Sequence, residues 1–210
     1  MTTNRTTTGP RRRRKEARPS EIVAAAMDVF AERGYGAAKL EEVARRAGVA
    51  KGTVFVYFPT KEDLFRAVAQ AILAAHLERL DGAGSDLELP LTTLIPLLLD
   101  QAALTGQSRA AAVIRLLIAE ARTFPDLAQV WHDEVLGKVL GVITAAIARA
   151  QARSEIRIGD PKLYAFSIVG PILAGVVFRE VFSQTDVPLP DLSALAKQHA
   201  QAILHGLVIV

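Results

Sequence analysis

The chain has 210 residues, half of them hydrophobic and only 6% aromatic, and it contains no cysteine. This length suits one large domain or a small domain joined to a larger one, and the apolar content can supply a substantial core. The lack of cysteine excludes disulfides and thiolate metal sites and favours a reducing compartment, so we expect a cytoplasmic protein.

The formal net charge of +3 is unevenly distributed, because residues 1–66 carry a net charge of +6 and residues 67–210 a net charge of −3. This asymmetry indicates that the basic end meets a polyanion, although a merely solvated charged end gives the same balance. No secretory signal is visible, and the most apolar stretch, Leu163 to Phe178, is too short to span a bilayer comfortably. We interpret that stretch as a buried helix and expect no membrane contact.

Residues 1–19 are rich in threonine and then strongly basic, so we expect a disordered basic tail. Ser20 is a plausible N-cap, and the apolar spacing after it predicts a helix that ends at Gly34. The next helix presents Leu40, Val43, Ala44 and Ala47 on one face and stops at Gly48. A third short helix is predicted from about Lys51 to Tyr57.

The remaining sequence also predicts helices. Residues 60–63 resemble a capping box, with Asp63 in the place usually taken by Glu, and open a helix to about Leu80. A linker over 81–85 follows, and further helices are predicted over 91–105, 109–123, 126–154, 161–182 and 191–205. The result is an all-α fold of about nine helices, divided into the tail 1–19, a three-helix domain 20–66 and a larger helical domain 67–210.

The segment from Leu40 to Phe58 has the pattern of two short helices around a tight turn. Ala44 is small where the helices approach, Gly48 can adopt the left-handed conformation that ends a helix, and Val54 faces the first helix. The face turned outward then consists of Lys51, Thr53, Val56 and Tyr57. This layout is typical of a helix-turn-helix that places its second helix in the DNA major groove.

The two-helix corner and the arginine run each have a simpler explanation that involves no DNA. A two-helix corner with small residues also occurs in proteins that never touch DNA, and an arginine run can be a solvated segment that only adds solubility. Alternatively, the basic run lies along phosphates or in a minor groove, through Arg11, Arg12, Arg13 and Arg14. We favour DNA contact because the basic tail, the corner and the outward polar face occur together.

Several motifs resemble the N-terminal domain of the TetR family of transcriptional regulators. They are Gly34-Tyr35-Gly36-Ala37, Val43-Ala44, Ala47-Gly48-Val49, Lys51-Gly52-Thr53, Tyr57-Phe58 and Lys61-Glu62-Asp63-Leu64. The resemblance covers about residues 21–68, and a corner at 119–127 is similar to one in the ligand-binding domains of such regulators. It implies a homodimer that binds a double-stranded DNA operator through two recognition helices and senses a small molecule in its C-terminal domains.

The resemblance also implies residue roles. Lys51 is expected to contact phosphate, Thr53 and Tyr57 to contact backbone and bases, and Gly52 to allow close approach to the DNA.

The chain departs from the family pattern in three places. Ala38 stands where a Thr or Ser commonly caps the second helix, so a cap worth about 1 kcal/mol is missing. Phe55 and Val56 remove hydroxyl contacts. We expect Lys39 to supply a phosphate contact by charge and Val56 to touch a thymine methyl group.

The C-terminal two-thirds of the chain is less informative. A ligand pocket between helices is expected, and the candidate lining residues are His76, Arg115, Arg122, Trp131 and Phe178, although each also has a structural explanation. Because cations are frequent among the polar candidates, an acidic or aromatic ligand is slightly favoured. The helices over 163–182 and 192–207 are apolar on most faces, which predicts pairing with a second subunit as a four-helix bundle.

Two other functions agree less well with the sequence. An enzyme is disfavoured because the sequence lacks the usual nucleophile, phosphate-loop and zinc-protease motifs, and we expect no catalytic residue, cofactor or metal. His132, Asp133 and Glu134 are consecutive, so on a helix they cannot converge on one metal. An architectural DNA-binding protein without ligand control does not need so large an apolar domain. The sequence therefore predicts a ligand-responsive transcriptional regulator, most simply a repressor.

Overall fold

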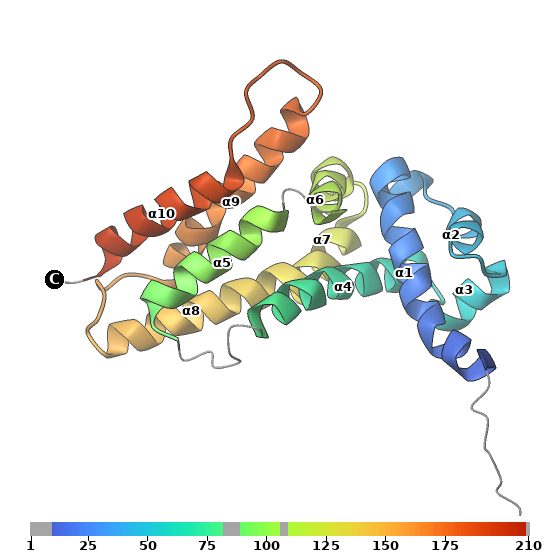
Figure 1. Ribbon diagram of the computed structural model, residues 1–210, viewed down its shortest axis with the longest axis horizontal. Coiled ribbons are helices and arrows are strands. Elements are labelled where there is room, and N and C mark those ends of the chain that lie inside the picture. The colour runs from blue at the N-terminus through green and yellow to red at the C-terminus, as the bar shows by residue number, and fades with distance from the viewer. Residues whose placement is uncertain (1–9, 82–88, 106–108, 209–210) are drawn as a thin grey trace, which may run out of the picture. The chain divides into compact units, whose positions relative to one another are not determined.

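The computed structural model describes residues 10–81, 89–105 and 109–208. In this part of the chain the architecture is helical, and the only β pairing is one isolated bridge between Ile156 and Val208 (Figure 1). Helices α7 (Pro125–Trp131), η1 (His132–Leu136) and α8 (Gly137–Ala152) follow one another without a break, so the described residues form nine helices. This confirms the predicted all-α fold. The described residues divide into two compact units, one up to Val68 and one from Ala69 onward.

The first unit is built on α1 (Pro10–Ala37), α2 (Leu40–Arg46), α3 (Lys51–Tyr57) and the start of α4 (Lys61–Asp81) (Figure 1). Three aromatic rings form the centre of its core, with ring centroids 5.6–5.9 Å apart: Phe30, Tyr35 and Phe65. Edge-to-face and tilted contacts at this spacing add to the gain from burying the rings. The core thereby joins the end of α1 to α4.

The beginning of α1 corrects a prediction. We expected residues 1–19 to be disordered and Ser20 to cap the helix, but α1 already begins at Pro10 and runs through Pro19. Arginine, lysine, glutamate and alanine favour helices, and the prediction weighed the lack of apolar residues above this propensity. Residues 1–9 lie outside the described part. The predicted end is confirmed, because Gly34 has φ +74° and ψ 172° and breaks the helix there.

Helix α4 begins with the predicted capping box. The Asp63 backbone N–H donates to the Thr60 hydroxyl at 3.0 Å, and the Thr60 backbone N–H donates to the Asp63 carboxylate at 3.1 Å. These reciprocal bonds satisfy donors that the first turn of a helix leaves without partners. The predicted linker over 81–85 lies outside the described residues, apart from Asp81 at the end of α4.

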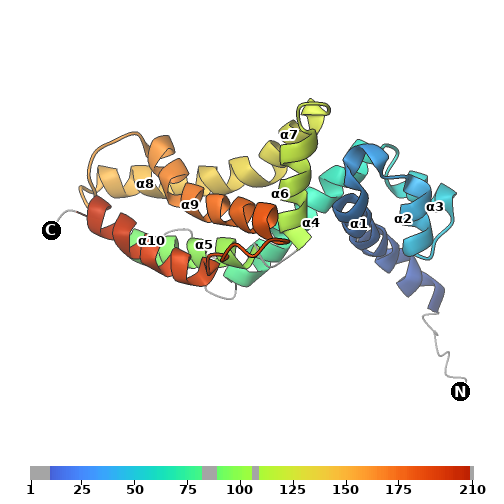
Figure 2. The ribbon, with the colours of Figure 1, turned by 90° about the horizontal axis from the view of Figure 1, so that it is seen from above.

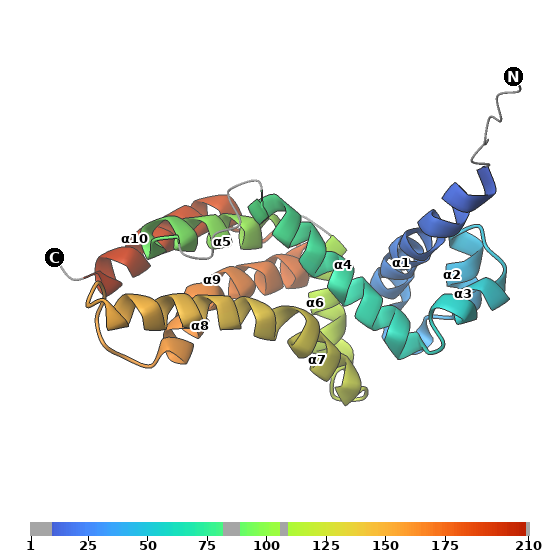
Figure 3. The same ribbon diagram turned by 90° about the horizontal axis from the view of Figure 1, so that it is seen from below.

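The second unit packs α9 (Pro161–Phe182) between α8 on one side and α5 (Leu91–Thr105) and α10 (Leu192–Leu207) on the other (Figures 2 and 3). Helix α6 (Arg109–Glu120) packs against α9 as well. The buried core is aliphatic, with Ile95, Leu99, Ile147, Ile168 and Ile172 among its fully buried members. The bounds of α5 and α9 agree with those expected from the sequence.

Helix α9 is not the fully buried helix that its apolar sequence suggested. One face, including Ala165, Ile168 and Ile172, is buried, while Phe166 and Val181 on another face are 60% and 63% exposed. Both Pro125–Ala152 and Pro161–Phe182 are long and apolar enough to span a membrane by length and composition alone. That test does not distinguish a membrane span from a helix that packs against protein.

Pro171 interrupts the hydrogen bonding inside α9, and α10 compensates. Proline has no N–H to donate to the carbonyl of the residue four positions earlier, which here is Ser167. His199 of α10 lies there, with its Nε2 atom 3.1 Å from the carbonyl oxygens of Ser167 and Ile168. A protonated Nε2 therefore supplies the donor that Pro171 lacks, and α10 is held against the middle of α9.

Replacing His199 by Leu should destabilise the second unit by about 1–3 kcal/mol, because the Ser167 carbonyl loses its donor. In a Pro171→Ala background the restored backbone N–H can bond to Ser167, so the same replacement should cost less. Chemical denaturation of the four proteins in this cycle measures the coupling. Equal costs in both backgrounds would show that His199 acts through packing alone.

Candidate functional site

Helices α2 and α3 meet at a tight left-handed turn. Gly48 has φ +65°, a conformation that favours glycine, and the helices on either side bury Ala44 and Val54. Val54 is 0% exposed and is the only buried residue of α3. One side chain therefore anchors a helix of seven residues, and the rest of that helix is available for contact.

The outer face of α3 combines charge with apolar surface. Lys51, Gly52, Phe55 and Val56 are exposed, and Val56 reaches 78%. An added Cβ at Gly52 would meet no atom within 4 Å, so packing inside the protein does not require glycine there. A protruding helix with one lysine, a bare backbone and two apolar side chains fits a partner that offers phosphates and apolar edges, as the DNA major groove does.

An ionic network fixes α2 on the end of α1. The Arg46 guanidinium donates to both carboxylate oxygens of Glu32, at 2.7 and 2.5 Å, and to Glu42 at 2.9 Å. Fork-shaped pairing of this kind is stronger and more directional than a single contact. The hydrogen bonds from Arg46 hold the pKa of Glu32 below its usual value.

The second unit contains an apolar cavity of about 310 Å³. Its lining comes from α5, α6, α7, η1, α8 and α9 and consists of Ala102, Ile114, Leu117, Ile118, Trp131, Val135, Leu136, Val139, Val169, Ile172, Leu173, Val176 and Val177. No charged side chain is among them. Because an unpaired charge inside such a cavity would be costly, the cavity suits an uncharged, apolar group.

The π-helical turn η1 shapes one wall of this cavity. It lies directly after Trp131 and contains Val135 and Leu136. Gly137 follows, where an added Cβ would come within 2.9 Å of the His132 carbonyl oxygen. Glycine therefore permits the wider turn, and π-helical turns are frequent at functional sites.

Comparison with known families identifies both units. Residues 22–68 match the model described as bacterial regulatory proteins of the tetR family, and residues 92–204 match the model for the C-terminal domain of AefR-like transcriptional repressors. The second match covers more than half of the chain. The chain belongs to the TetR family. Its C-terminal domain is of the AefR-like type.

Individual relatives of this TetR-family chain agree with the assignment. The HTH-type transcriptional regulator RutR of Escherichia coli K12 is 43% identical over 67 residues, which cover 32% of each protein. The chain thus matches about a third of the length of such curated relatives.

Solved structures match nearly the whole chain in fold. FadR of Bacillus subtilis, in complex with stearoyl-CoA, is 22% identical with a TM-score of 0.69, covering 89% of this chain and 98% of the other. The flavonoid-responsive regulator FrrA is 20% identical with a TM-score of 0.65, covering 92% and 98%.

The residues expected to contact DNA come from three elements: five lie on α3, Lys39 precedes α2, and four arginines lie on α1. Thr53 and Tyr57 are half-buried, one turn apart, and Val56 is the most exposed apolar residue of α3. The N-cap of α2 is Lys39 and not Ala38, where the missing hydroxyl was expected, and Lys39 makes no side-chain cap because a lysine ammonium cannot accept a hydrogen bond. The backbone of Arg11, Arg12, Arg13 and Arg14 is in α1, while their side chains lie outside the described part.

Sequence analysis missed two lysine contacts in this TetR-type domain. Lys61 donates from Nζ to the carbonyl oxygens of Tyr35, Gly36 and Ala38, at 2.7–3.2 Å, and lies 4.6 Å from the centroid of the Tyr35 ring. It holds the loop that leads into α2. Lys51, which is expected to contact phosphate, forms an ion pair with the Glu41 carboxylate. Charge patterning alone could not reveal either contact, because the partners lie on different elements.

The structure places the residues expected to line a ligand pocket at different sites. Of the five, Trp131 lines the apolar cavity, and the side chain of His76 lies outside the described part. Arg115 pairs with Glu180 at 2.9 Å, and Arg122 is exposed after the end of α6. Phe178 lines a surface groove instead. The sequence-based preference for an acidic ligand therefore loses its basis, since no cation lines this cavity.

The Glu32–Arg46 pair predicts an acid-sensitive first unit. Because the pKa of Glu32 is lower in the folded than in the unfolded chain, the pair stabilises the fold above the unfolded pKa and this gain is lost as pH falls through the folded pKa. Arg46→Met should therefore lower the Tm at neutral pH, and its difference from the unmodified protein should shrink below about pH 4.3. Circular dichroism at a series of pH values measures this.

Arg45→Met is the control for this prediction, since the exposed Arg45 reaches only Glu42, at 3.9 Å. It should change the Tm little at any pH. A pH-independent effect of Arg46→Met would mean that Arg46 stabilises the unit by packing and not through the Glu32 carboxylate.

Proposed function

We propose that this TetR-family protein binds operator DNA through α3 and is released from it by an apolar small molecule. The observation that supports DNA binding best is the protruding α3 after the left-handed turn at Gly48. Lys51 is placed for phosphate contact, Gly52 for close approach of the duplex, and Val56 for a thymine methyl group. Thr53 and Tyr57 share the adjoining face. Repression is the role that agrees with the AefR-like C-terminal domain.

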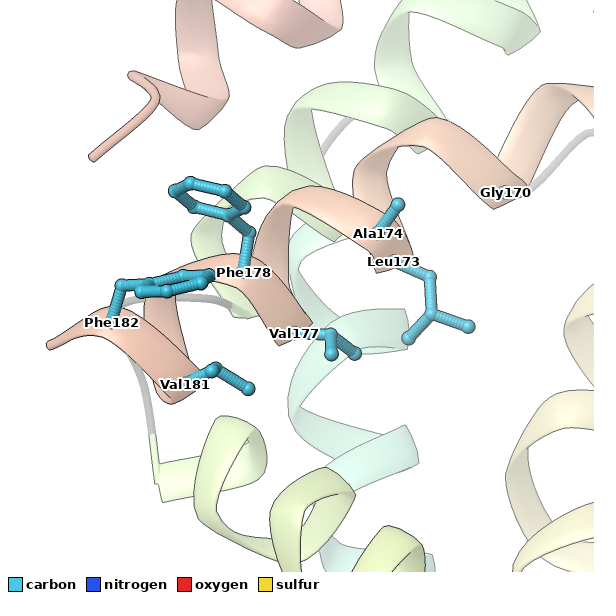
Figure 4. Close-up of a pocket in the computed structure, with 7 residues that line it drawn as sticks. All are labelled: Gly170, Leu173, Ala174, Val177, Phe178, Val181 and Phe182. Atoms are coloured by element: carbon cyan, nitrogen blue, oxygen red, sulfur yellow. The ribbon is translucent and has the colours of Figure 1, made fainter. Parts of the chain in front are cut away.

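We infer a homodimer formed through α9. A groove on its exposed face is lined by Gly170, Leu173, Ala174, Val177, Phe178, Val181 and Phe182, and the rings of Phe178 and Phe182 meet in a tilted contact with their centroids 4.5 Å apart (Figure 4). The small residues Gly170 and Ala174 let a second helix approach α9 closely, and the exposed apolar side chains of the groove need to be covered. The α9 helix of a second copy of this chain can make the close approach and cover these side chains. A two-fold dimer then binds two half-sites about 34–36 Å apart.

The apolar cavity is the proposed effector site. Its lining has no charged group and includes an aromatic side chain, so a fatty acyl chain fits its chemistry, with any polar head outside the cavity. The structural neighbour FadR was solved with stearoyl-CoA, which agrees with this class, and FrrA is described as flavonoid-responsive, which makes a flat aromatic ligand the second candidate.

Release from DNA is explained by thermodynamic linkage between ligand binding and the arrangement of the dimer. Leu173 and Val177 line both the inner cavity and the α9 groove, so a ligand and a second subunit contact the same two side chains. A ligand that prefers one dimer arrangement can weaken DNA binding only by its difference in affinity between arrangements. Helix α4 contributes buried residues to both units, Phe65 to the first and Ile72 to the second, and is the continuous element through which such a change passes.

Selection from random double-stranded DNA is expected to enrich a palindrome with half-sites one helical turn apart. Tyr57→Ala should weaken binding to the selected site by about 1–3 kcal/mol while leaving non-specific binding nearly unchanged. Lys51→Ala should weaken binding to the selected site and flatten its salt dependence, because Lys51 contributes a phosphate contact there. Fluorescence anisotropy with selected and scrambled duplexes measures both effects.

Val181→Asp tests the dimer in the same system. Val181 is largely exposed, so the substitution should leave the fold intact, yet it places a charge in the proposed interface. Light scattering should then report monomers, and the palindromic preference should be lost.

If no sequence is enriched by the unmodified protein, an architectural role replaces the operator-binding one.

Ligand binding can be followed through Trp131, the only tryptophan in the chain. Titration with saturated fatty acids of increasing length, and with their coenzyme A thioesters, should shift its emission and release labelled operator DNA. Ile114→Asp puts a carboxylate at a partly buried position of the cavity wall and should weaken binding about tenfold or more. Emission titrations give both affinities.

Ile158→Asp is the matched control, since Ile158 is an exposed isoleucine that does not line the cavity. It should bind like the unmodified protein. Equal affinities for the two aspartate variants would place the ligand elsewhere, and a response to a flavonoid alone would favour the aromatic class.

A further inference from the structure

The carboxylate of Glu41 lies among the lysines expected to hold DNA phosphates. Glu41 is in the first turn of α2, and it forms an ion pair with Lys51 at the start of α3. Both side chains are about half exposed, at 56% and 55%, so the pair is at the surface. The Nζ atom of Lys51 also lies 5.7 Å from the centroid of the exposed Phe55 ring. Lys51 is thus held between a carboxylate and an aromatic face.

The same carboxylate is affected by a second lysine. The hydrogen bond from Lys51 lowers the pKa of Glu41 most, followed by the backbone N–H of Glu41, and the charge of Lys39 contributes as well. Glu41 is therefore ionised at neutral pH. Its neighbour Glu42 is directed elsewhere, to Arg46 and Arg33. One negative charge consequently lies close to the two lysines expected to meet the DNA backbone, where it competes with an approaching phosphate for Lys51.

We propose that Glu41 is a specificity-determining residue that withholds Lys51 from DNA of the wrong sequence. The proposal rests on the DNA-binding function assigned to α3 above. On a matching site, base contacts of α3 hold a phosphate against Lys51, and this phosphate replaces Glu41. On other sequences no base contact holds that phosphate in place, and the Glu41–Lys51 pair stays closed.

The physical basis is the different origin of the two affinities. Non-specific binding comes almost entirely from lysine and arginine contacts with phosphates, and each such contact contributes about 0.9 to the slope of log K against log salt. A lysine that is paired with a carboxylate of the same protein makes no phosphate contact and does not contribute to this slope. In the specific complex Lys51 does contact a phosphate, so Glu41 lowers non-specific affinity more than specific affinity.

The test compares Glu41→Gln with the unmodified protein on selected and scrambled duplexes over a range of salt concentrations. Glutamine keeps the size of the side chain and removes its charge. Affinity for scrambled DNA should rise about fivefold per subunit at low salt, the effect of one charge at about 4 Å in water. Its salt slope should steepen by about 0.9 per subunit, while the slope for the selected site should not change.

Glu155→Gln controls for net charge, because it removes one surface carboxylate paired with Arg153 in the second unit. It should leave both slopes unchanged. In a Lys51→Met background, Glu41→Gln should no longer alter the slope, since its effect passes through Lys51. An undiminished effect there would show that Glu41 repels DNA directly, and this result would overturn the proposed pairing mechanism.

Two further results would also reject the proposal without touching the function itself. One is equal salt slopes on scrambled DNA for Glu41→Gln and the unmodified protein. The other is a gain in affinity that is the same for selected and scrambled duplexes. Failure of the unmodified protein to prefer any sequence would instead remove the DNA-binding assignment on which the proposal rests.

Discussion

The burial of Val54 is the constraint on which the DNA-binding surface depends. Helix α3 has seven residues, which is far too short to be stable by itself in water. Its conformation and its orientation come from one fully buried side chain and from the left-handed turn at Gly48. Because so little of α3 is needed for packing, its remaining faces can carry Lys51, Gly52 and Val56. A longer or more deeply buried helix would have fewer positions left for contact.

The second unit meets a related constraint in α9, which has to satisfy two surfaces at once. Its buried face completes the aliphatic core, and its exposed face forms the groove of Figure 4. Leu173 and Val177 border the groove and also the inner cavity. In a closely packed protein, a change on one side of such a wall is transmitted to the other, since side chains cannot yield without moving their neighbours. This shared wall would give ligand binding in the proposed effector site a physical route to the proposed subunit interface.

Much of the fold could be predicted because its helices begin and end at strong signals. Gly34, Gly48 and the Thr60 capping box are local features, and the structure has a boundary at each. The start of α1 could not be predicted, since helix propensity favours a helix there while the lack of apolar residues to bury favours disorder. The cavity was harder still. The candidates were polar or aromatic side chains, and of these Trp131 lines the cavity, whereas the other lining residues are aliphatic and indistinguishable by sequence from core residues.

The lysines of the first unit show why a sequence motif does not determine the strength of a phosphate contact. A sequence pattern assigns charge to positions, but the strength of a phosphate contact depends on what else the lysine touches. Lys61 is held by three backbone carbonyls, and Lys51 by Glu41. Both charges are partly neutralised within the protein, and Ala38 and Phe55 remove the hydroxyl donors common in the family. The corner therefore contributes less non-specific attraction than its composition suggests, so we expect sequence selectivity to depend on the fit of α3 and propose that the arginines of α1 supply general affinity.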